Sequence, residues 1–152
     1  MAAFYKDNGS SLFEALIDMY VEHGLFVERL VSVTKKGTAG AEEIQNMMLN
    51  FRANPPSNLG GSPVVMVKDF LSEEVKYLET GQHESTQLPG SNVLQFITKD
   101  GSIISARPSG TEPKIKFYCS VNTHLESKEL YETKSAELEH KIDRILVDLE
   151  VK

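Results

Sequence analysis

Three short runs with the alternation of β-strands, set close together, constrain the fold of this chain more than any other feature. They span residues 93–98, 102–107 and 114–121. The first two are separated by residues 99–101, Lys-Asp-Gly, which is a typical hairpin turn. Strands joined this closely pair antiparallel, so the sequence predicts an antiparallel sheet.

Two amphipathic helices are predicted to cover that sheet. Their apolar residues recur at helical spacing, ending before Pro55 in the first case and near the C-terminus in the second. These residues are Ile44, Met47, Met48 and Phe51, and then Tyr131, Leu138, Ile142, Ile145 and Leu149. With further strands predicted over 25–34 and 64–70, the order β-α-β-β-β-β-α indicates an α+β fold with a four- to five-stranded antiparallel sheet.

Two other segments complete the predicted organisation. Ser11 and Glu14 fit a capping box, and an apolar stripe runs from Leu12 to Tyr20 before Gly24 ends this first helix. Residues 71–92 are polar and show no clear period. We expect them to be irregular, with a short helical turn around 72–78.

Composition excludes several classes of protein. The 152 residues are 40% hydrophobic and carry a net charge of −6, which fits a globular domain and argues against a nucleic-acid binder. No apolar run approaches the roughly 20 residues that span a bilayer, and the N-terminus does not resemble a signal peptide. A single cysteine, Cys119, rules out an intrachain disulfide. We therefore expect a cytoplasmic protein with no membrane partner.

The segment from Arg107 to Lys114, Arg-Pro-Ser-Gly-Thr-Glu-Pro-Lys, concentrates groups that bind a phosphate dianion. Arg107 offers a planar fork of donors, and Ser109 and Thr111 offer hydroxyls. Gly110 allows close approach of the backbone and an unusual φ, so that successive N–H groups can converge on an anion. The segment lies between two predicted strands.

Two lysines follow this segment on the next strand. Lys114 and Lys116 alternate with Ile115 and Phe117, so both lysines are expected on the face away from the core. By composition alone the segment is also compatible with an ordinary polar turn, because it lacks the fixed spacing of a Walker loop. The residues themselves leave these two interpretations open.

The longer run over residues 100–118 resembles the phosphate-binding loop in the C-terminal domain of the α-D-phosphohexomutases, the phosphoglucomutase and phosphomannomutase family. The resemblance implies a TATA-binding-protein-like α+β fold. It also implies that Arg107, Ser109, Gly110 and Thr111 hold the phosphate of the substrate that is not reacting. Lys116 matches a basic residue on the following strand of that family.

The resemblance extends over essentially the whole chain. Residues 1–24 resemble the last helix of the family's third domain, and residues 25–152 resemble its fourth domain. Met1 resembles an internal methionine, so we expect a piece of a longer enzyme. The family's phosphoserine loop, magnesium loop and sugar-recognition motif have no counterpart in these residues. The resemblance thus implies no catalytic or metal-binding residue here, an inactive isolated chain, and Mg²⁺ as a cofactor of the full-length enzyme.

In the full-length enzyme, the resemblance implies interconversion of hexose 1-phosphate and hexose 6-phosphate through a phosphoserine. Which sugar is used does not follow from these residues. The alternative function is a non-catalytic α+β module that binds a protein or a nucleic acid. A complete small enzyme would need a nucleophile–base pair, and the sequence offers none. Residues 4–23 carry an apolar stripe that also predicts self-association.

Overall fold

The computed structural model describes residue 6, residue 9 and residues 11–151. The helices are α2 (Leu12–His23), α3 (Gly37–Ala53), the 3₁₀ helix η1 (Lys128–Leu130) and α4 (Tyr131–Asp148). The strands are β1 (Leu25–Thr34), β2 (Asn58–Leu59), β3 (Ser62–Asp69), β4 (Glu74–Tyr77), β5 (His83–Ser85), β6 (Leu94–Thr98), β7 (Ile103–Pro108) and β8 (Lys114–Thr123).

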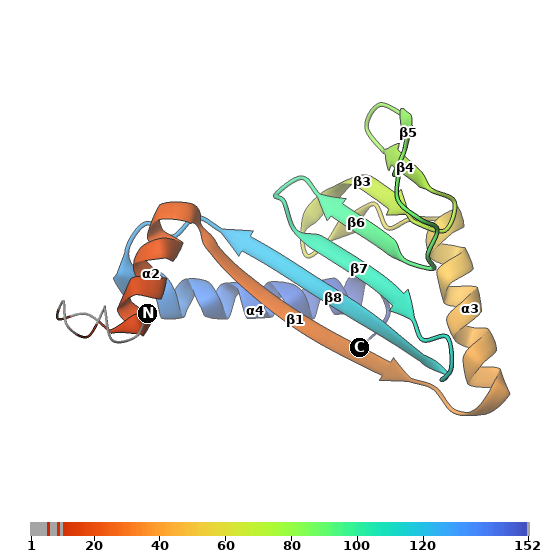
Figure 1. The fold of residues 1–152 in the computed structure, drawn as a ribbon, viewed down its shortest axis with the longest axis horizontal. Helices are drawn as coiled ribbons and strands as arrows, with labels where there is room; N and C mark the ends of the chain where they lie inside the picture. The colour runs from red at the N-terminus through yellow and green to blue at the C-terminus, as the bar shows by residue number, and fades with distance from the viewer. Residues whose placement is uncertain (1–5, 7–8, 10, 152) are drawn as a thin grey trace.

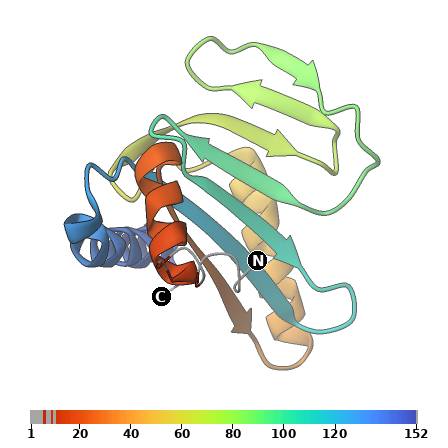
Figure 2. The same cartoon turned by 60° about the vertical axis from the view of Figure 1, so that its left-hand side comes forward.

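The strands form one antiparallel sheet, and α3 and α4 cover one of its faces (Figures 1 and 2). The strand order is β1-β8-β7-β6-β3-β4-β5, and the short β2 pairs with β3. The predicted class, an α+β fold with an antiparallel sheet, is confirmed. The hairpin between β6 and β7 turns where residues 99–101 predict it, with Gly101 at a φ of 84°.

The core lies between the sheet and the helices α3 and α4. Phe51 of α3 packs edge-on against Phe96 of β6, with ring centroids 5.8 Å apart. Strand β8 buries alternate side chains in this layer, namely Ile115, Phe117, Cys119 and Val121. Helix α4 contributes Leu138, Ile142, Ile145 and Leu146. The opposite face of the sheet, called the open face below, carries Lys114 and Lys116, as alternation predicts.

The sheet has eight strands rather than the four to five predicted. The additional strands are β2, β4 and β5, and the helical turn predicted around 72–78 is wrong because β4 occupies that position. β5 is exposed throughout. A strand held at a sheet edge by backbone hydrogen bonds needs no apolar alternation, so its sequence shows no period.

Helix α2 begins with the predicted capping box. The Ser11 hydroxyl accepts a hydrogen bond from the Glu14 backbone N–H at 3.0 Å, and Glu14 Oε2 accepts one from the Ser11 N–H at 2.7 Å. Tyr20 stacks on Tyr131, with ring centroids 6.2 Å apart, but only Ile17 of this helix is buried.

The assignment of residues 1–24 to a separate unit stays a prediction. Of residues 4–23, positions 4, 5, 7, 8 and 10 lie outside the described residues.

Deleting residues 1–23 tests both that assignment and self-association. We expect a loss of about 1.5–3 kcal/mol in the free energy of unfolding, the value of one buried Ile side chain. Exposed Leu12, Phe13, Leu16 and Met19 would leave with the helix. The truncated chain should therefore sediment as a monomer under conditions where the full chain associates. Failure of the truncated chain to fold, measured by circular dichroism and urea unfolding, would make α2 an integral part of the sheet domain.

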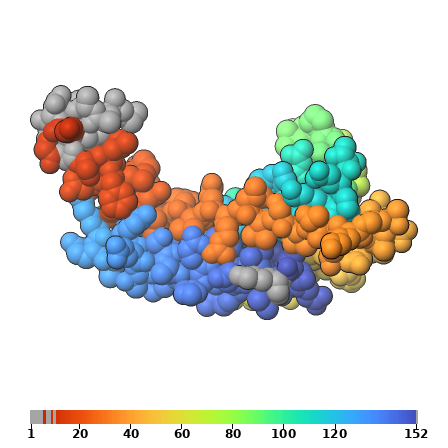
Figure 3. Space-filling model, turned by 90° about the horizontal axis from the view of Figure 1, so that it is seen from below, coloured from red at the N-terminus to blue at the C-terminus, as the bar shows by residue number. Residues whose placement is uncertain are grey.

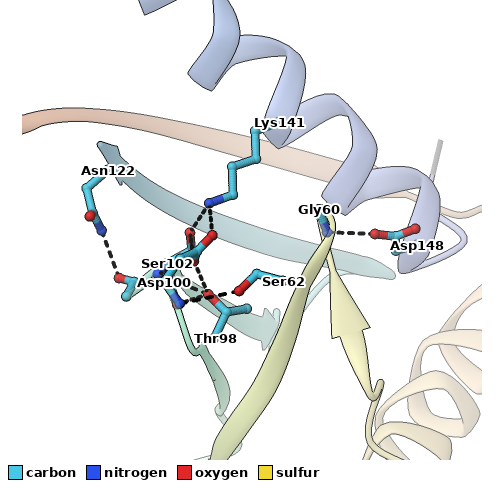
Figure 4. A network of polar contacts seen from close by, with 9 residues as sticks. Gly60, Ser62, Thr98, Asp100, Ser102, Asn122, Lys141 and Asp148 are labelled. Atoms are coloured by element: carbon cyan, nitrogen blue, oxygen red, sulfur yellow. Dashed lines mark hydrogen bonds and ion pairs between the residues drawn. The ribbon is translucent and has the colours of Figure 1, made fainter. Parts of the chain in front are cut away.

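A partly buried polar network joins helix α4 to the β6–β7 hairpin (Figure 4). Lys141 Nζ donates to Asp100 Oδ2 at 2.5 Å and to Ser102 Oγ at 2.8 Å. The other carboxylate oxygen of Asp100 accepts hydrogen bonds from the hydroxyls of Thr98 and Ser102. Partial burial opposes ionisation of Asp100, but these hydrogen bonds outweigh it and hold its pKa well below the usual value.

We expect Asp100→Asn to lower the free energy of unfolding by about 1–2 kcal/mol at pH 7. A charge-assisted hydrogen bond contributes about 1.5–3 kcal/mol, and this carboxylate is partly exposed. Because folding lowers its pKa, its contribution is complete above the unfolded-state value of about 3.9 and is lost as the pH falls through the folded-state value. The difference in the free energy of unfolding between Asp100→Asn and the wild type, measured in urea, should therefore become smaller as the pH is lowered toward about 2.

Glu137→Gln is the matched control for this network. Glu137 is an exposed residue of the same helix and pairs with Lys134, so its loss should change stability by less than about 0.5 kcal/mol. An Asp100→Asn variant as stable as wild type at pH 7 would contradict the role assigned to Asp100.

Candidate functional site

Arg107 and Lys116 lie opposite one another on the open face. Arg107 is near the end of β7 and Lys116 near the start of β8, and the two residues are direct partners in the antiparallel register. Ser32 of β1 is the partner of Lys116 on its other side. Like charges placed directly opposite destabilise a sheet. An anion bound between Arg107 and Lys116 would therefore relieve the repulsion between their positive charges.

These cations have no acidic partner among the described residues, which distinguishes them from many cations elsewhere in the chain. Arg52 is paired with Asp69 at 3.0 Å, and Lys141 with Asp100. Arg29 binds Glu139 and Asp143 of α4. In residues 11–151, no hydrogen bond or ion pair joins the side chains of Arg107, Lys114 or Lys116 to another group. Their charge is available to a ligand.

The loop over residues 109–113 connects β7 to β8 beside these cations. The Ser109 backbone N–H donates to the Lys114 carbonyl at 2.7 Å. The Ser109 hydroxyl accepts long hydrogen bonds from the N–H groups of Thr111 and Glu112, at 3.4 and 3.3 Å. The Gly110 N–H donates to none of the described residues. The loop is thus closed by its own backbone and by Ser109, while Gly110 and Thr111 remain exposed.

Gly110 does not adopt the unusual φ that the sequence analysis offered as a reason for glycine at this position. Its φ is not among the positive values of the described backbone, and a Cβ built on it meets no atom within 4 Å. The physical role of glycine here is the absence of a side chain. The exposed backbone can be approached closely by a ligand.

The loop stands over helix α3 with a hollow between them. The Lys35 N–H donates to the Pro113 carbonyl at 2.8 Å, which ties the loop to the turn that precedes α3. The hollow has a volume of about 430 Å³. Gln45 and Asn92 are among the residues that line it. Sequence reasoning did not find these two, because no pattern joins residues so distant in the chain.

Other candidate chemistries have less support in the described part of the chain. No group of three or more His, Cys, Asp or Glu side chains comes together there in a way that could hold a metal ion. Burial raises the pKa of Cys119 to about 11, with a small opposing effect of Arg29, so its thiol is protonated and unreactive at neutral pH. None of the described helices is both long and apolar enough to cross a membrane.

Comparison with known proteins identifies the family. Residues 57–143, more than half of the chain, match the family described as phosphoglucomutase/phosphomannomutase, C-terminal domain. The chain belongs to this family. The matched residues include the whole β7–β8 connection and both of its flanking cations, Arg107 and Lys116.

Its relatives include bacterial phosphoglucomutases. The chain is 36% identical over 117 residues to the phosphoglucomutase of Staphylococcus haemolyticus, covering 77% of this chain and 21% of the relative. It is 38% identical over 114 residues to that of Staphylococcus saprophyticus, covering 75% and 20%. The chain thus spans about a fifth of the length of the curated relatives it matches.

A solved structure shares the fold. The chain is similar to the exocytosis-sensitive phosphoprotein pp63/parafusin, a phosphoglucomutase from Paramecium in its open form, with a TM-score of 0.53 and 14% identity. The superposition covers 93% of this phosphoglucomutase-family chain and 23% of the Paramecium chain. At this identity the likeness concerns the fold alone.

The glycine at position 110 can be tested separately from binding. We expect Gly110→Ala to change the free energy of unfolding by less than about 0.5 kcal/mol, because the added methyl group meets open space. The matched control is Gly40→Ala in α3, where the new Cβ would lie 2.5 Å from Lys35 Cβ and 2.9 Å from its backbone carbon. That variant should be clearly destabilised in urea unfolding. If Gly110→Ala and Gly40→Ala lost equal amounts of unfolding free energy, the open geometry of the loop would be contradicted.

Proposed function

We propose that this chain is the substrate-phosphate-binding C-terminal domain of a phosphohexomutase. In this proposal the guanidinium of Arg107 and the ammonium of Lys116 bind the phosphate that is not reacting. The Thr111 hydroxyl and the Gly110 backbone N–H complete the contacts. Ser109 shapes the loop and presents its hydroxyl at the edge of the site. The phosphate belongs to a hexose 1- or 6-phosphate.

The observation that carries this proposal is the unpaired cation pair beside an exposed loop. Arg107 and Lys116 face each other across two strands, with a third cation, Lys114, on the same face. A phosphate dianion would turn this repulsion into charge-assisted hydrogen bonds, which contribute about 1.5–3 kcal/mol each when shielded from water. Membership of the phosphoglucomutase/phosphomannomutase family supports the choice of a phosphosugar.

For the whole protein we propose a cytoplasmic enzyme that interconverts the two hexose phosphates through a phosphoserine, with Mg²⁺ as cofactor. The 152 residues contain no recognisable phosphoserine or magnesium loop. We therefore propose that the isolated chain has no turnover of its own. Its contribution is to hold the substrate, and such positioning accounts for a large share of catalysis in phosphoryl transfer.

The alternative, a non-catalytic module for a protein or a nucleic acid, has one observation in its favour. The open face exposes two aromatic side chains, Phe26 and Tyr118. The net charge of −6 disfavours a nucleic acid, and the family match favours a phosphosugar. Phosphate binding at the β7–β8 loop separates the two functions.

A phosphate titration followed by amide chemical shifts tests the proposed site. We expect shifts centred on residues 107–116 with a dissociation constant on the order of millimolar, because the loop is open to water and association costs several kcal/mol. Arg107→Ala should abolish these shifts, since the fork of donors is lost. The measurement uses the full chain with inorganic phosphate as the probe.

Arg144→Ala is the matched control for Arg107→Ala. Arg144 is an exposed arginine on α4, outside the open face, and its replacement changes the net charge by the same amount. Phosphate binding should survive this substitution nearly unchanged, because exposed charges beyond about 8 Å are largely screened at physiological salt. An absence of shifts in residues 107–116 at tens of millimolar phosphate would leave the loop an ordinary turn.

A further inference from the structure

A groove on the open face begins directly beyond the cation pair. Its volume is about 280 Å³, and the residues that line it include Glu28, Leu30, Ile103, Ser105, Tyr118 and Ser120. The groove crosses the three neighbouring strands β1, β8 and β7. Figure 3 shows this side of the sheet hollowed between α2 at one end, in red, and the β4–β5 hairpin at the other, in green.

The groove combines an aromatic ring with hydrogen-bonding groups. Tyr118 is 41% exposed and has Leu30 and Ser105 as its direct neighbours on β1 and β7. Gln95 donates a hydrogen bond to the Ser105 hydroxyl at 3.1 Å, which fixes that oxygen beside the ring. An apolar surface with a few oriented polar groups is the usual chemistry of a small-molecule site. A sugar ring, with C–H groups on its face and hydroxyls at its rim, fits this surface.

The spacing relates the groove to the cations. Tyr118 follows Lys116 by two residues on the same face of β8, and Ser105 precedes Arg107 by two residues on β7. Two residues of an antiparallel strand span about 6.8 Å. A phosphate between Arg107 and Lys116 therefore places the group it is attached to over Tyr118 and Ser105. This distance is on the scale of one phosphorylated sugar ring.

The far end of the groove has the opposite charge. Glu28 accepts a hydrogen bond from the Ser120 hydroxyl at 3.4 Å, which holds the carboxylate at that end. Ser120 lies four residues beyond Lys116 on the same strand, so about 14 Å separates this end of the groove from the cations. A carboxylate repels a phosphate and accepts hydrogen bonds from sugar hydroxyls. The groove thus has one favourable orientation for a phosphosugar, with the phosphate at the cations.

We propose that the groove over Tyr118 holds the sugar ring of the substrate whose phosphate lies between Arg107 and Lys116. Tyr118 is then a positioning residue, and Ser105 and Glu28 are the polar groups that distinguish a ring with hydroxyls from an open-chain phosphate ester. This inference rests on the proposed function. It adds sugar recognition to a domain to which only phosphate binding was assigned above.

The test compares three probes on the full chain by amide chemical shifts: inorganic phosphate, glycerol 3-phosphate and glucose 6-phosphate. We expect glucose 6-phosphate to bind about fivefold tighter than glycerol 3-phosphate, the gain that one aromatic contact provides. In Tyr118→Ala, glucose 6-phosphate and glycerol 3-phosphate should bind with about equal affinity, and the affinity for inorganic phosphate should stay unchanged. Tyr118→Phe should keep most of the preference for glucose 6-phosphate over glycerol 3-phosphate, because the aromatic ring remains.

Phe26→Ala is the matched control, since it removes an exposed aromatic ring from the same face of β1, outside the groove. The inference is overturned if the wild type binds glucose 6-phosphate no tighter than glycerol 3-phosphate. It is also overturned if Phe26→Ala loses this preference as fully as Tyr118→Ala does. Neither outcome affects the proposed phosphate binding. Absence of any phosphate shift in residues 107–116 overturns the proposed function and this inference together. If Tyr118→Ala does not fold, the inference is tested in the wild type by nuclear Overhauser contacts between the Tyr118 ring and the protons of the bound sugar. Their absence overturns the inference.

Discussion

The alternation of strand β8 determines both the stability of this domain and the position of its candidate site. β8 lies between β1 and β7 in the sheet, and every second side chain packs against α3 and α4. The side chains in between project onto the open face, where Lys116 and Tyr118 lie two residues apart. A shift of one residue in the register would bury the lysines and expose Ile115 and Phe117. The free energy of core packing therefore also fixes the geometry of the site.

Two ionic attachments to the middle of helix α4 support that geometry. Asp100 and Lys141 hold the β6–β7 hairpin to α4, and Arg29 of β1 binds two acidic residues of the same helix. Each attachment satisfies charges that would otherwise be costly to bury. Arg107 and Lys116 are different because no acidic side chain among the described residues neutralises them. A protein that pairs its structural cations and leaves two opposed cations unpaired has a surface suited to an anion.

The sequence predicted the class of fold because it depends on short-range patterns, and a short-range pattern also carries the candidate site, which stays a prediction. Alternation over 102–107 and 114–121 located β7 and β8, and the loop between them carried the motif shared with the phosphohexomutases. The strands β4 and β5 were missed because an edge hairpin is held by backbone hydrogen bonds and leaves no apolar period. The hollow beside Gln45 and Asn92 and the groove at Tyr118 depend on contacts between distant segments. No local pattern encodes these contacts.

The pairing of β1 with β8 also determines the order in which this domain can be made. The register joins Leu25 to Thr123, so one edge of the sheet closes a loop of almost a hundred residues. Closing so long a loop is entropically unfavourable until other contacts have formed, whereas the β6–β7 and β7–β8 hairpins are local. During synthesis, residues up to Thr123 must emerge from the ribosome before β1 can pair with β8 along its whole length. Until then, the apolar side of β1 is available to chaperones and to other unfinished chains.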